Sequence, residues 1–362
     1  MNRRWIALMM VLILVLSACS GGEQTVAQPA VEEATEAPEA TATATAIPPT
    51  ATAAPPTAKP DPPTSTPEPP TPTPMPVEVV EDVPYIDDGI PEHTSDIYLP
   101  AEVEGPYPTV VIYHSGVFWY RGEIRHAEAY DALARYFAGR GYAVVVPSYR
   151  VSETDPYPAA VEDAFCSVAW VHAEAAQYGF DIDRVAALGW EAGADLASLV
   201  GTVDERERFV ENCPHALPEE PWVRSVVAIG GFYHLPSLFD RMDPGVQNYI
   251  VHYLQAMPEE APERYAEASP ITWVDGSEPP FAVIYNRCQI YVDFRERALE
   301  FADTLEAAGS SAEVIELSMD LYPSFPQPDS QAELRPGWQP SWEVYGVPQA
   351  ESYLAEQFGI DD

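Results

Sequence analysis

The residues of this chain best placed to do chemistry form the pentapeptide Gly-Trp-Glu-Ala-Gly at positions 189–193. Residues 184–188 are a short apolar run typical of a buried strand, and residues 194–200 carry small and apolar side chains at helical spacing. The pattern predicts a strand, a sharp turn and a helix, with the Glu191 carboxylate at the apex. A carboxylate there could act as a nucleophile, or could stay bound to backbone N–H groups and to the N-terminus of the following helix.

The histidines offer little further chemistry. No partner at metal-ligand spacing accompanies the five histidines His126, His172, His215, His234 and His252. We therefore expect neither a metal site nor a cofactor. His114 follows a continuous apolar run at residues 108–113 that is typical of a central strand.

The composition limits the partners of the protein. The chain has 362 residues, 39 prolines and a formal net charge of −39. So large an excess of acidic groups repels nucleic acid and anionic membrane surfaces, and we expect neither to bind the folded surface. Most of the N-terminal prolines precede residue 80, which sets a low-complexity region apart from the rest of the chain.

The first 19 residues are typical of an export signal. A basic Asn-Arg-Arg precedes an apolar run at residues 5–16, and Leu-Ser-Ala-Cys follows at residues 16–19. This segment resembles a bacterial lipoprotein signal, in which Cys19 would be lipidated and become the new N-terminus. We predict a membrane-anchored lipoprotein of the cell envelope, outside the cytoplasm. An ordinary cleaved signal and an uncleaved anchor are the alternatives.

Residues 20–83 are rich in Pro, Thr, Ala and Glu. Such a segment has too little apolar bulk to offset the entropy lost on ordering, so we predict a disordered linker that spaces the protein from its membrane. The folded domain is expected at residues 84–362, a length that suits one large α/β domain.

Several segments of this domain resemble, in the correct order, the hormone-sensitive-lipase-like and feruloyl-esterase-like carboxylesterases. Residues 114–119, His-Ser-Gly-Val-Phe-Trp, resemble the family's His-Gly-Gly-Gly-x-Trp loop. Residues 157–163, Tyr-Pro-Ala-Ala-Val-Glu-Asp, resemble its Pro-Ala-Ala-Val-Glu-Asp segment, and residues 189–193 keep the frame of its Gly-x-Ser-x-Gly elbow. The resemblance implies an α/β-hydrolase fold, with a mostly parallel central sheet and helices on both faces.

In that family the backbone N–H groups of the first loop form part of an oxyanion hole beside the elbow. Only Gly116 remains of the loop's glycines, and the residues on either side of it are departures. The resemblance implies that the loop and pocket comprise His114, Ser115, Gly116, Val117, Trp190 and Ala192. It also implies that His114 is a structural residue of the loop, which packs rather than reacts.

The resemblance also implies a catalytic triad, and this chain departs from it at all three positions. Glu191 stands at the nucleophile position, Gln289 at the acid position and Pro323 at the base position. No histidine follows His252 in the chain, so none can supply the base from the expected loop. The sequence therefore argues against a serine–histidine esterase mechanism.

Two classes of function follow. The favoured one is a lipid-anchored pseudo-hydrolase with a binding or scaffolding role, in which Glu191 fills the serine socket as a built-in anion. Its partner would be a small neutral or cationic ligand, or another protein. The alternative is an exported hydrolase of the carboxylic-ester type that uses Glu191 as an unconventional nucleophile.

Cysteines outside the reducing cytoplasm are expected to pair. Cys166 lies on the predicted helix before the elbow strand, and Cys213 follows the elbow helix, so both lie beside the same pair of elements. We predict a disulfide between them and a free, structural thiol at Cys288.

Overall fold

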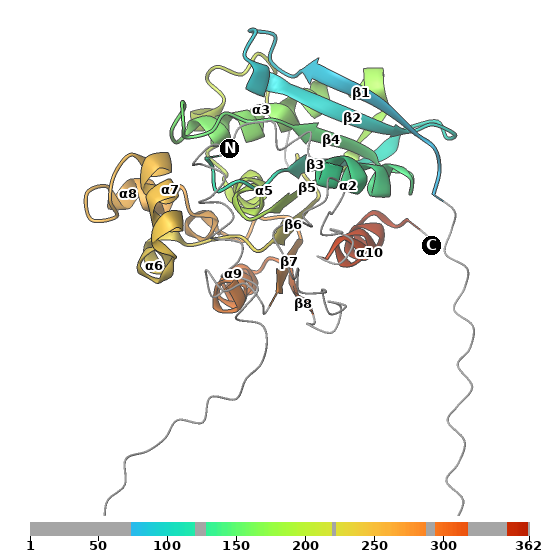
Figure 1. Cartoon of the computed structure of the whole chain (residues 1–362). Helices are drawn as coiled ribbons and strands as arrows, with labels where there is room; N and C mark the ends of the chain where they lie inside the picture. Colours follow the sequence, from blue (N-terminus) through green and yellow to red (C-terminus); the bar gives the residue numbers. More distant parts are fainter. Residues whose placement is uncertain (1–73, 120–127, 219–221, 287–293, 318–345, 361–362) are drawn as a thin grey trace, which may run out of the picture.

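We describe a computed structural model of the chain, which places residues 74–119, 128–218, 222–286, 294–317 and 346–360. Its centre is an eight-stranded sheet with the strand order β1-β2-β4-β3-β5-β6-β7-β8 (Figure 1). The strands are β1 Val77–Pro84, β2 Thr94–Pro100, β3 Tyr107–Tyr113, β4 Ala143–Pro147, β5 Phe180–Trp190, β6 Ser225–Ile229, β7 Phe281–Asn286 and β8 Ala312–Leu317. Pairing is antiparallel from β1 to β2 and from β2 to β4, and parallel across the rest. The mostly parallel sheet confirms the predicted fold class.

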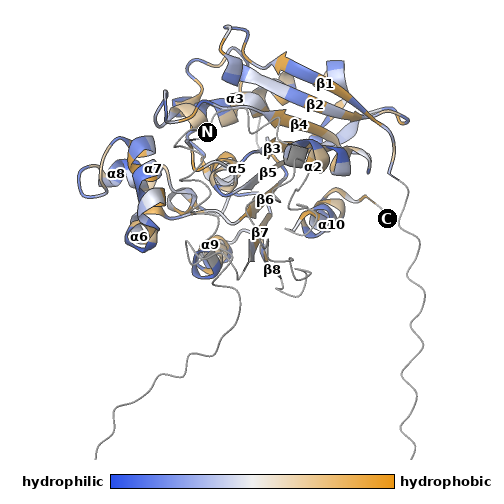
Figure 2. Cartoon of the chain, in the orientation of Figure 1, coloured by the Kyte–Doolittle hydropathy of each residue, from blue (hydrophilic) through white to orange (hydrophobic). Residues whose placement is uncertain are grey.

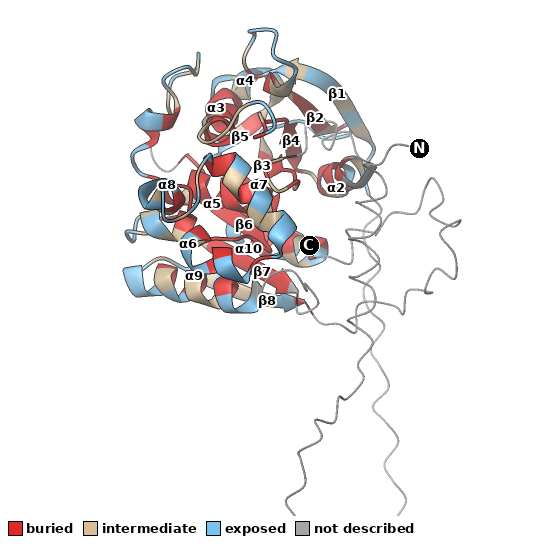
Figure 3. Cartoon of the chain, turned by 60° about the vertical axis from the view of Figure 1, so that its left-hand side comes forward, coloured by how far each residue is buried: buried red, intermediate tan, exposed pale blue. Residues whose placement is uncertain are grey.

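Helices cover both faces of this sheet (Figure 1). One face carries α3 Ala159–Ala173, α5 Ala192–Thr202 and α9 Phe294–Ala308, and the other carries α2 Glu128–Ala138 and α10 Val347–Phe358. Because both faces are buried, the central strands are nearly continuous apolar runs rather than alternating ones. Figure 2 shows this apolar concentration in the strands, and Figure 3 shows that α3 and α5 are themselves largely buried.

Shorter elements connect this framework. The remaining α-helices are α4 Ala175–Tyr178, α6 Leu235–Leu238, α7 Pro244–Leu254 and α8 Pro262–Glu267. Short 3-10 turns lie at η1 Pro91–His93, η3 Arg206–Phe209, η4 Phe239–Arg241 and η5 Pro270–Trp273. The segment from α6 to α8 is inserted between β6 and β7 and forms a group to one side of the sheet (Figure 1).

The start of the folded domain was predicted wrongly at residue 84. Strand β1 begins at Val77 and pairs with β2 along most of its length. Its valines alternate imperfectly with glutamate and aspartate, as suits an edge strand with one face to solvent, and this short pattern is easily lost beside the proline-rich segment. The preceding part of the predicted linker, with the signal and Cys19, lies outside the described residues. Among the described helices, none is long and apolar enough to cross a membrane.

The predicted disulfide is confirmed. Cys166 on α3 is joined to Cys213, which follows η3, and their Cα atoms lie 5.5 Å apart. The bond closes a loop with a sequence separation of 47, which contains β5 and α5. The cross-link therefore encloses the strand, turn and helix that the sequence marks as the centre of the site. Cys288 lies outside the described residues.

Removing this cross-link by the double substitution Cys166→Ala and Cys213→Ser is expected to lower the free energy of unfolding by about 4 kcal/mol, because the unfolded chain regains the entropy of a loop of this length. Urea denaturation of the variant and of the wild-type protein measures the difference. Wild-type protein unfolded in the presence of a reductant should match the variant. Equal stability of oxidised wild-type protein and variant would contradict the prediction.

Candidate functional site

The elbow predicted from residues 189–193 is present. Strand β5 ends at Trp190 and helix α5 begins at Ala192, so that Glu191 alone forms the turn between them. Its backbone has φ 52° and ψ −115°, a region that side chains other than glycine rarely adopt. The strained turn directs the Glu191 side chain away from both elements.

The two glycines of the elbow are required by close approaches of the backbone. A Cβ atom on Gly189 would lie 2.1 Å from the carbonyl oxygen of Gly193, and one on Gly193 would lie 2.2 Å from the carbonyl oxygen of Tyr113. Tyr113 is the last residue of β3 and precedes His114. The elbow is therefore packed against the start of the predicted oxyanion loop, with no room for a side chain between them.

The Glu191 carboxylate is bound by the oxyanion loop. The backbone N–H of Gly116 donates to Oε2 of Glu191 over 3.1 Å, and the N–H of Val117 also stabilises the ionised carboxylate. These donors belong to the loop in which the family resemblance placed the oxyanion hole. The site thus contains its own anion where a reacting oxygen would otherwise be stabilised.

Buried side chains hold this loop in place. The ring of His114 stacks on Tyr149 with centroids 4.1 Å apart, and the Tyr149 hydroxyl donates to the His114 carbonyl oxygen over 2.7 Å. The N–H of Ser115 donates to the Tyr130 hydroxyl over 2.6 Å. His114 is fully buried, and through these contacts it supports the loop.

The end of the loop is strained and clamped. Val117 and Phe118 both have positive φ, 52° and 56°, which costs free energy for residues with bulky side chains. The Phe118 ring stacks on Tyr253 of α7, with centroids 4.0 Å apart and planes 2° from parallel. The contact with α7 stabilises a backbone conformation that the loop would not adopt alone.

Burial and hydrogen bonding act in opposite directions on Glu191. Loss of solvent raises the pKa of its carboxyl group, and the N–H groups of Gly116 and Val117 lower it. The desolvation effect is the larger, so the net pKa is raised. The hydrogen bonds from the oxyanion loop therefore offset only part of the free energy that the carboxylate loses on removal from water.

A second carboxyl group, Asp195, lies one helical turn after Glu191. It is buried on α5, and its Oδ1 accepts hydrogen bonds from the N–H groups of Phe232 at 3.1 Å and Tyr233 at 2.9 Å. Burial raises the pKa of Asp195 to about 8, and the nearby charge of Glu191 adds to the increase. Asp195 therefore ties the segment after β6 to α5. Its carboxyl group also lies close enough to that of Glu191 for the two to repel each other when both are ionised.

Asp195 was missed at the sequence level, although a signal was present. It is the one charged residue within α5, whose sequence is otherwise composed of small, apolar and hydroxyl side chains. An isolated carboxylate among buried helix positions requires partners. The sequence gives no indication that those partners are backbone N–H groups some 37 positions along the chain.

The remaining predicted site residues divide into two groups. Trp190 and Ala192 are core residues: Trp190 packs edge-on against Tyr130 on the α2 face, and Ala192 is buried on the α5 face. Gln289 and Pro323 lie outside the described residues, so their places in the site remain predictions. Among the described residues, no group of three or more His, Cys, Asp and Glu side chains is placed to hold a metal ion.

Comparison with known proteins gives a consistent result. The family model for BD-FAE matches residues 95–299, more than half of the chain. The esterase LipC of Mycobacterium tuberculosis is 28% identical over 227 residues, which cover 61% of this chain and 54% of LipC. The probable carboxylic ester hydrolase LipM of the same organism is 30% identical over 174 residues, which cover 48% of this chain and 39% of LipM. The matches thus span about half of these relatives' length or less.

Solved structures show the same fold. A truncated carbohydrate esterase from gut microbiota superposes with a TM-score of 0.60 at 20% identity, covering 77% of this chain and 96% of that one. The esterase LipW from Mycobacterium marinum superposes with a TM-score of 0.51 at 25% identity, covering 78% of this chain and 82% of that one. The framework around Glu191 is therefore that of α/β-hydrolase esterases.

Replacing Glu191 by alanine should create a binding site for acetate. The substitution removes a methylene and a carboxylate, which acetate matches in size and charge, and frees the N–H groups of the loop. We expect the melting temperature of Glu191→Ala to rise with acetate concentration. At concentrations above the Kd, the free energy of unfolding should increase by about 1.4 kcal/mol for each tenfold increase in acetate. Chloride should not reproduce the effect, and wild-type protein and Glu191→Gln should not respond. Equal responses of all three proteins would contradict this prediction.

The buried carboxyl of Asp195 should make stability depend on pH. Because its folded-state pKa of about 8 lies above the ordinary aspartate value of 3.8, the folded protein binds this proton more tightly than the unfolded chain does. Its contribution to stability is therefore lost as the pH rises from about 4 to about 8. Asp195→Asn should reduce the loss between pH 5 and pH 9 by about 4 kcal/mol.

Urea denaturation at pH 5, 7 and 9 measures this dependence. The matched control is Asp204→Asn, which alters an exposed aspartate and should leave the pH dependence as in the wild-type protein. If Asp195→Asn also has the wild-type dependence, Asp195 is ionised in the folded protein throughout this range and the expected coupling is absent.

Proposed function

The chain belongs to the BD-FAE family of carboxylesterase-like α/β-hydrolases, and from this premise we propose that it is a pseudo-hydrolase with a binding or scaffolding role. The observation that carries the proposal is the contact between Oε2 of Glu191 and the N–H of Gly116. An ester hydrolase of this fold needs those N–H groups free for the oxygen that becomes negative in the transition state. Here a side chain of the protein itself occupies one of them.

The occupied hole also disfavours a ligand carbonyl. A substrate carbonyl oxygen would have to displace an ionised carboxylate, and charge-assisted hydrogen bonds are stronger than those to a neutral carbonyl. Displaced from the loop, Glu191 would lose this hydrogen bond, and its charge would still lie close to Asp195. Such displacement is unfavourable for any substrate that offers only a neutral carbonyl in exchange.

The charges at the site define the class of ligand. Glu191 and Asp195 place two carboxyl groups one helical turn apart, and anionic ligands would be repelled by either when ionised. A small neutral or cationic ligand, or a protein partner with such a group, fits the site better. We extend the proposal to the location: a lipoprotein anchored through Cys19 outside the cytoplasm. The disulfide supports an oxidising compartment.

The second candidate is an exported hydrolase of carboxylic esters in which Glu191 is the nucleophile. The names of the relatives favour it, since LipC and LipM are described as an esterase and a probable carboxylic ester hydrolase. In this mechanism the carboxylate attacks the acyl carbon, the alcohol leaves, and an acyl–glutamyl anhydride forms. Water must then cleave the anhydride with the help of a base, and the expected position for that base holds Pro323.

Hydrolysis of p-nitrophenyl acetate and butyrate by the whole protein separates the two candidates. Wild-type protein is compared with Glu191→Ala, which removes the carboxylate, and with Glu191→Gln, which keeps its shape without its charge. We expect release of p-nitrophenol at the rate of buffer alone in all three proteins. The Asp204→Asn variant serves as a control for changes in surface charge.

Turnover by the wild-type protein at least a hundredfold above buffer, lost in both Glu191 variants, would establish the glutamate hydrolase and overturn the pseudo-hydrolase proposal. Turnover retained in all variants would overturn both, since neither candidate has a nucleophile other than Glu191.

A further inference from the structure

A cavity of about 150 Å³ lies beside the disulfide, and its lining includes neither Glu191 nor the loop 114–117. Ile86 and Ile90, from the connection between β1 and β2, form an apolar side together with Phe209. Cys166 and Cys213 both line the cavity. The disulfide is therefore part of the cavity wall.

The two cysteines differ in their exposure. Cys166 is 1% exposed on α3, whereas Cys213 is partly exposed in the loop that follows η3. Thiol–disulfide exchange requires a thiolate to approach along the line of the S–S bond. Because Cys213 is the more exposed of the two residues, we expect the thiolate to attack its Sγ, with Cys166 as the departing sulfur.

We propose that this cavity admits small thiols and that they open the disulfide by attack on Cys213. The thiolate forms a bond to Sγ of Cys213, the Cys166–Cys213 bond breaks, and Cys166 leaves as a thiolate that takes up a proton. A second thiolate attacks the external sulfur of the mixed disulfide, so that Cys213 leaves in turn. Two small thiols are oxidised to one disulfide, and the protein disulfide is reduced to two thiols.

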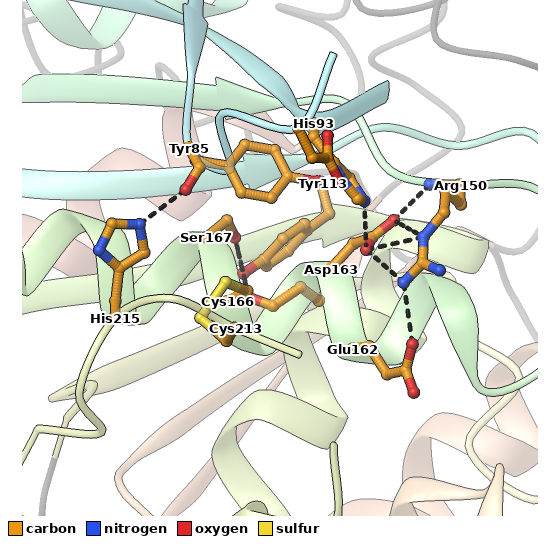
Figure 4. The surroundings of a disulfide bond; sticks show 12 residues. Tyr85, His93, Tyr113, Arg150, Glu162, Asp163, Cys166, Ser167, Cys213 and His215 are labelled. Carbon is orange, nitrogen blue, oxygen red and sulfur yellow. Dashed lines mark hydrogen bonds and ion pairs between the residues drawn. A yellow bond between two sulfur atoms is a disulfide. The ribbon is translucent and has the colours of Figure 1, made fainter. Parts of the chain in front are cut away.

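Charged side chains around the cavity select among thiols (Figure 4). Asp163 accepts hydrogen bonds from Arg150, with 2.8 Å between Nη2 and Oδ1, and contacts Nε2 of His93 at 3.1 Å. Asp88 contacts Nδ1 of His93 at 2.8 Å, and Glu162 accepts from Arg150 at 2.8 Å. Three carboxylates thus face two basic groups, and the whole chain is strongly acidic. Cationic and neutral thiols are therefore favoured over anionic ones.

Each side of the disulfide is also held by a further contact. His215 follows Cys213 by two residues and contacts the carbonyl oxygen of Tyr85, the residue after β1, with 2.7 Å between Nε2 and O. On the other side of the bond, the Tyr113 hydroxyl donates to Ala164 of α3 (Figure 4). The cross-link joins these two regions, and its reaction with thiols is independent of the proposed function.

The experiment treats the whole folded protein with cysteamine, 2-mercaptoethanol and 3-mercaptopropionate at equal thiolate concentrations. Reactions are stopped with N-ethylmaleimide and mapped by mass spectrometry. We expect the mixed disulfide on Cys213 and the maleimide on Cys166. Cysteamine should react about tenfold faster than 3-mercaptopropionate, with 2-mercaptoethanol between them.

Two variants test the role of the cavity. Glu162→Gln should reduce the preference for cysteamine about threefold, while Glu306→Gln, an exposed glutamate on α9, should leave it unchanged. Ile90→Trp places a large ring at the apolar side, where Ile90 is 37% exposed, and should slow all three thiols about tenfold.

Three results would overturn the proposal. The first is a disulfide that reacts only at the rate of global unfolding, with the same rate for every thiol. The second is an adduct on Cys166 rather than on Cys213. The third is a rate order that ignores the charge of the thiol and is unchanged by Glu162→Gln and Ile90→Trp.

Discussion

The carbonyl oxygen of Tyr113 lies where a side chain on Gly193 would be, and the site depends on this close approach. It brings the end of β3 against the first turn of α5, so that the loop after β3 faces the residue before α5. Glu191 stands at that point, and its side chain reaches the loop after β3. The hydrogen bond from Gly116 to its carboxylate follows from this geometry. A larger residue at Gly193 would separate the loop from the elbow whatever residue stood at the apex.

Much of this framework could be predicted from the sequence because its determinants are local. The apolar runs of the central strands, the glycine frame of the elbow and the succession of motifs led to a mostly parallel sheet with helices on both faces. The pairing of Cys166 with Cys213 was predicted because each lies next to an element that the elbow joins. The loop that holds the Glu191 carboxylate was also predicted, because residues 114–119 keep enough of the family's loop motif to identify its position.

The features that escaped prediction depend on contacts between distant segments. Strand β1 is stabilised by pairing with β2, and its own sequence is too short and too acidic to indicate a strand beside a proline-rich segment. Asp195 is satisfied by N–H groups of the segment after β6, which only the folded sheet brings to α5. The cavity beside the disulfide lies where the β1–β2 connection and the segment around η3 meet α3, three parts of the chain that are far apart in the sequence. Local propensity cannot reveal such pairings.

The esterase framework and the glutamate at its apex are compatible because the framework supplies donors, not a reaction. Backbone N–H groups at a strained loop and at a helix N-terminus stabilise negative charge whether it belongs to a transition state or to a side chain. In a hydrolase that charge appears only during turnover, and until then no side chain of the protein accepts hydrogen bonds from these donors. Here the carboxyl group of Glu191 occupies them in the folded protein, and the net effect of burial raises its pKa. Similarity to esterases therefore accounts for the arrangement of the donors, whereas the chemistry is decided by the group they hold.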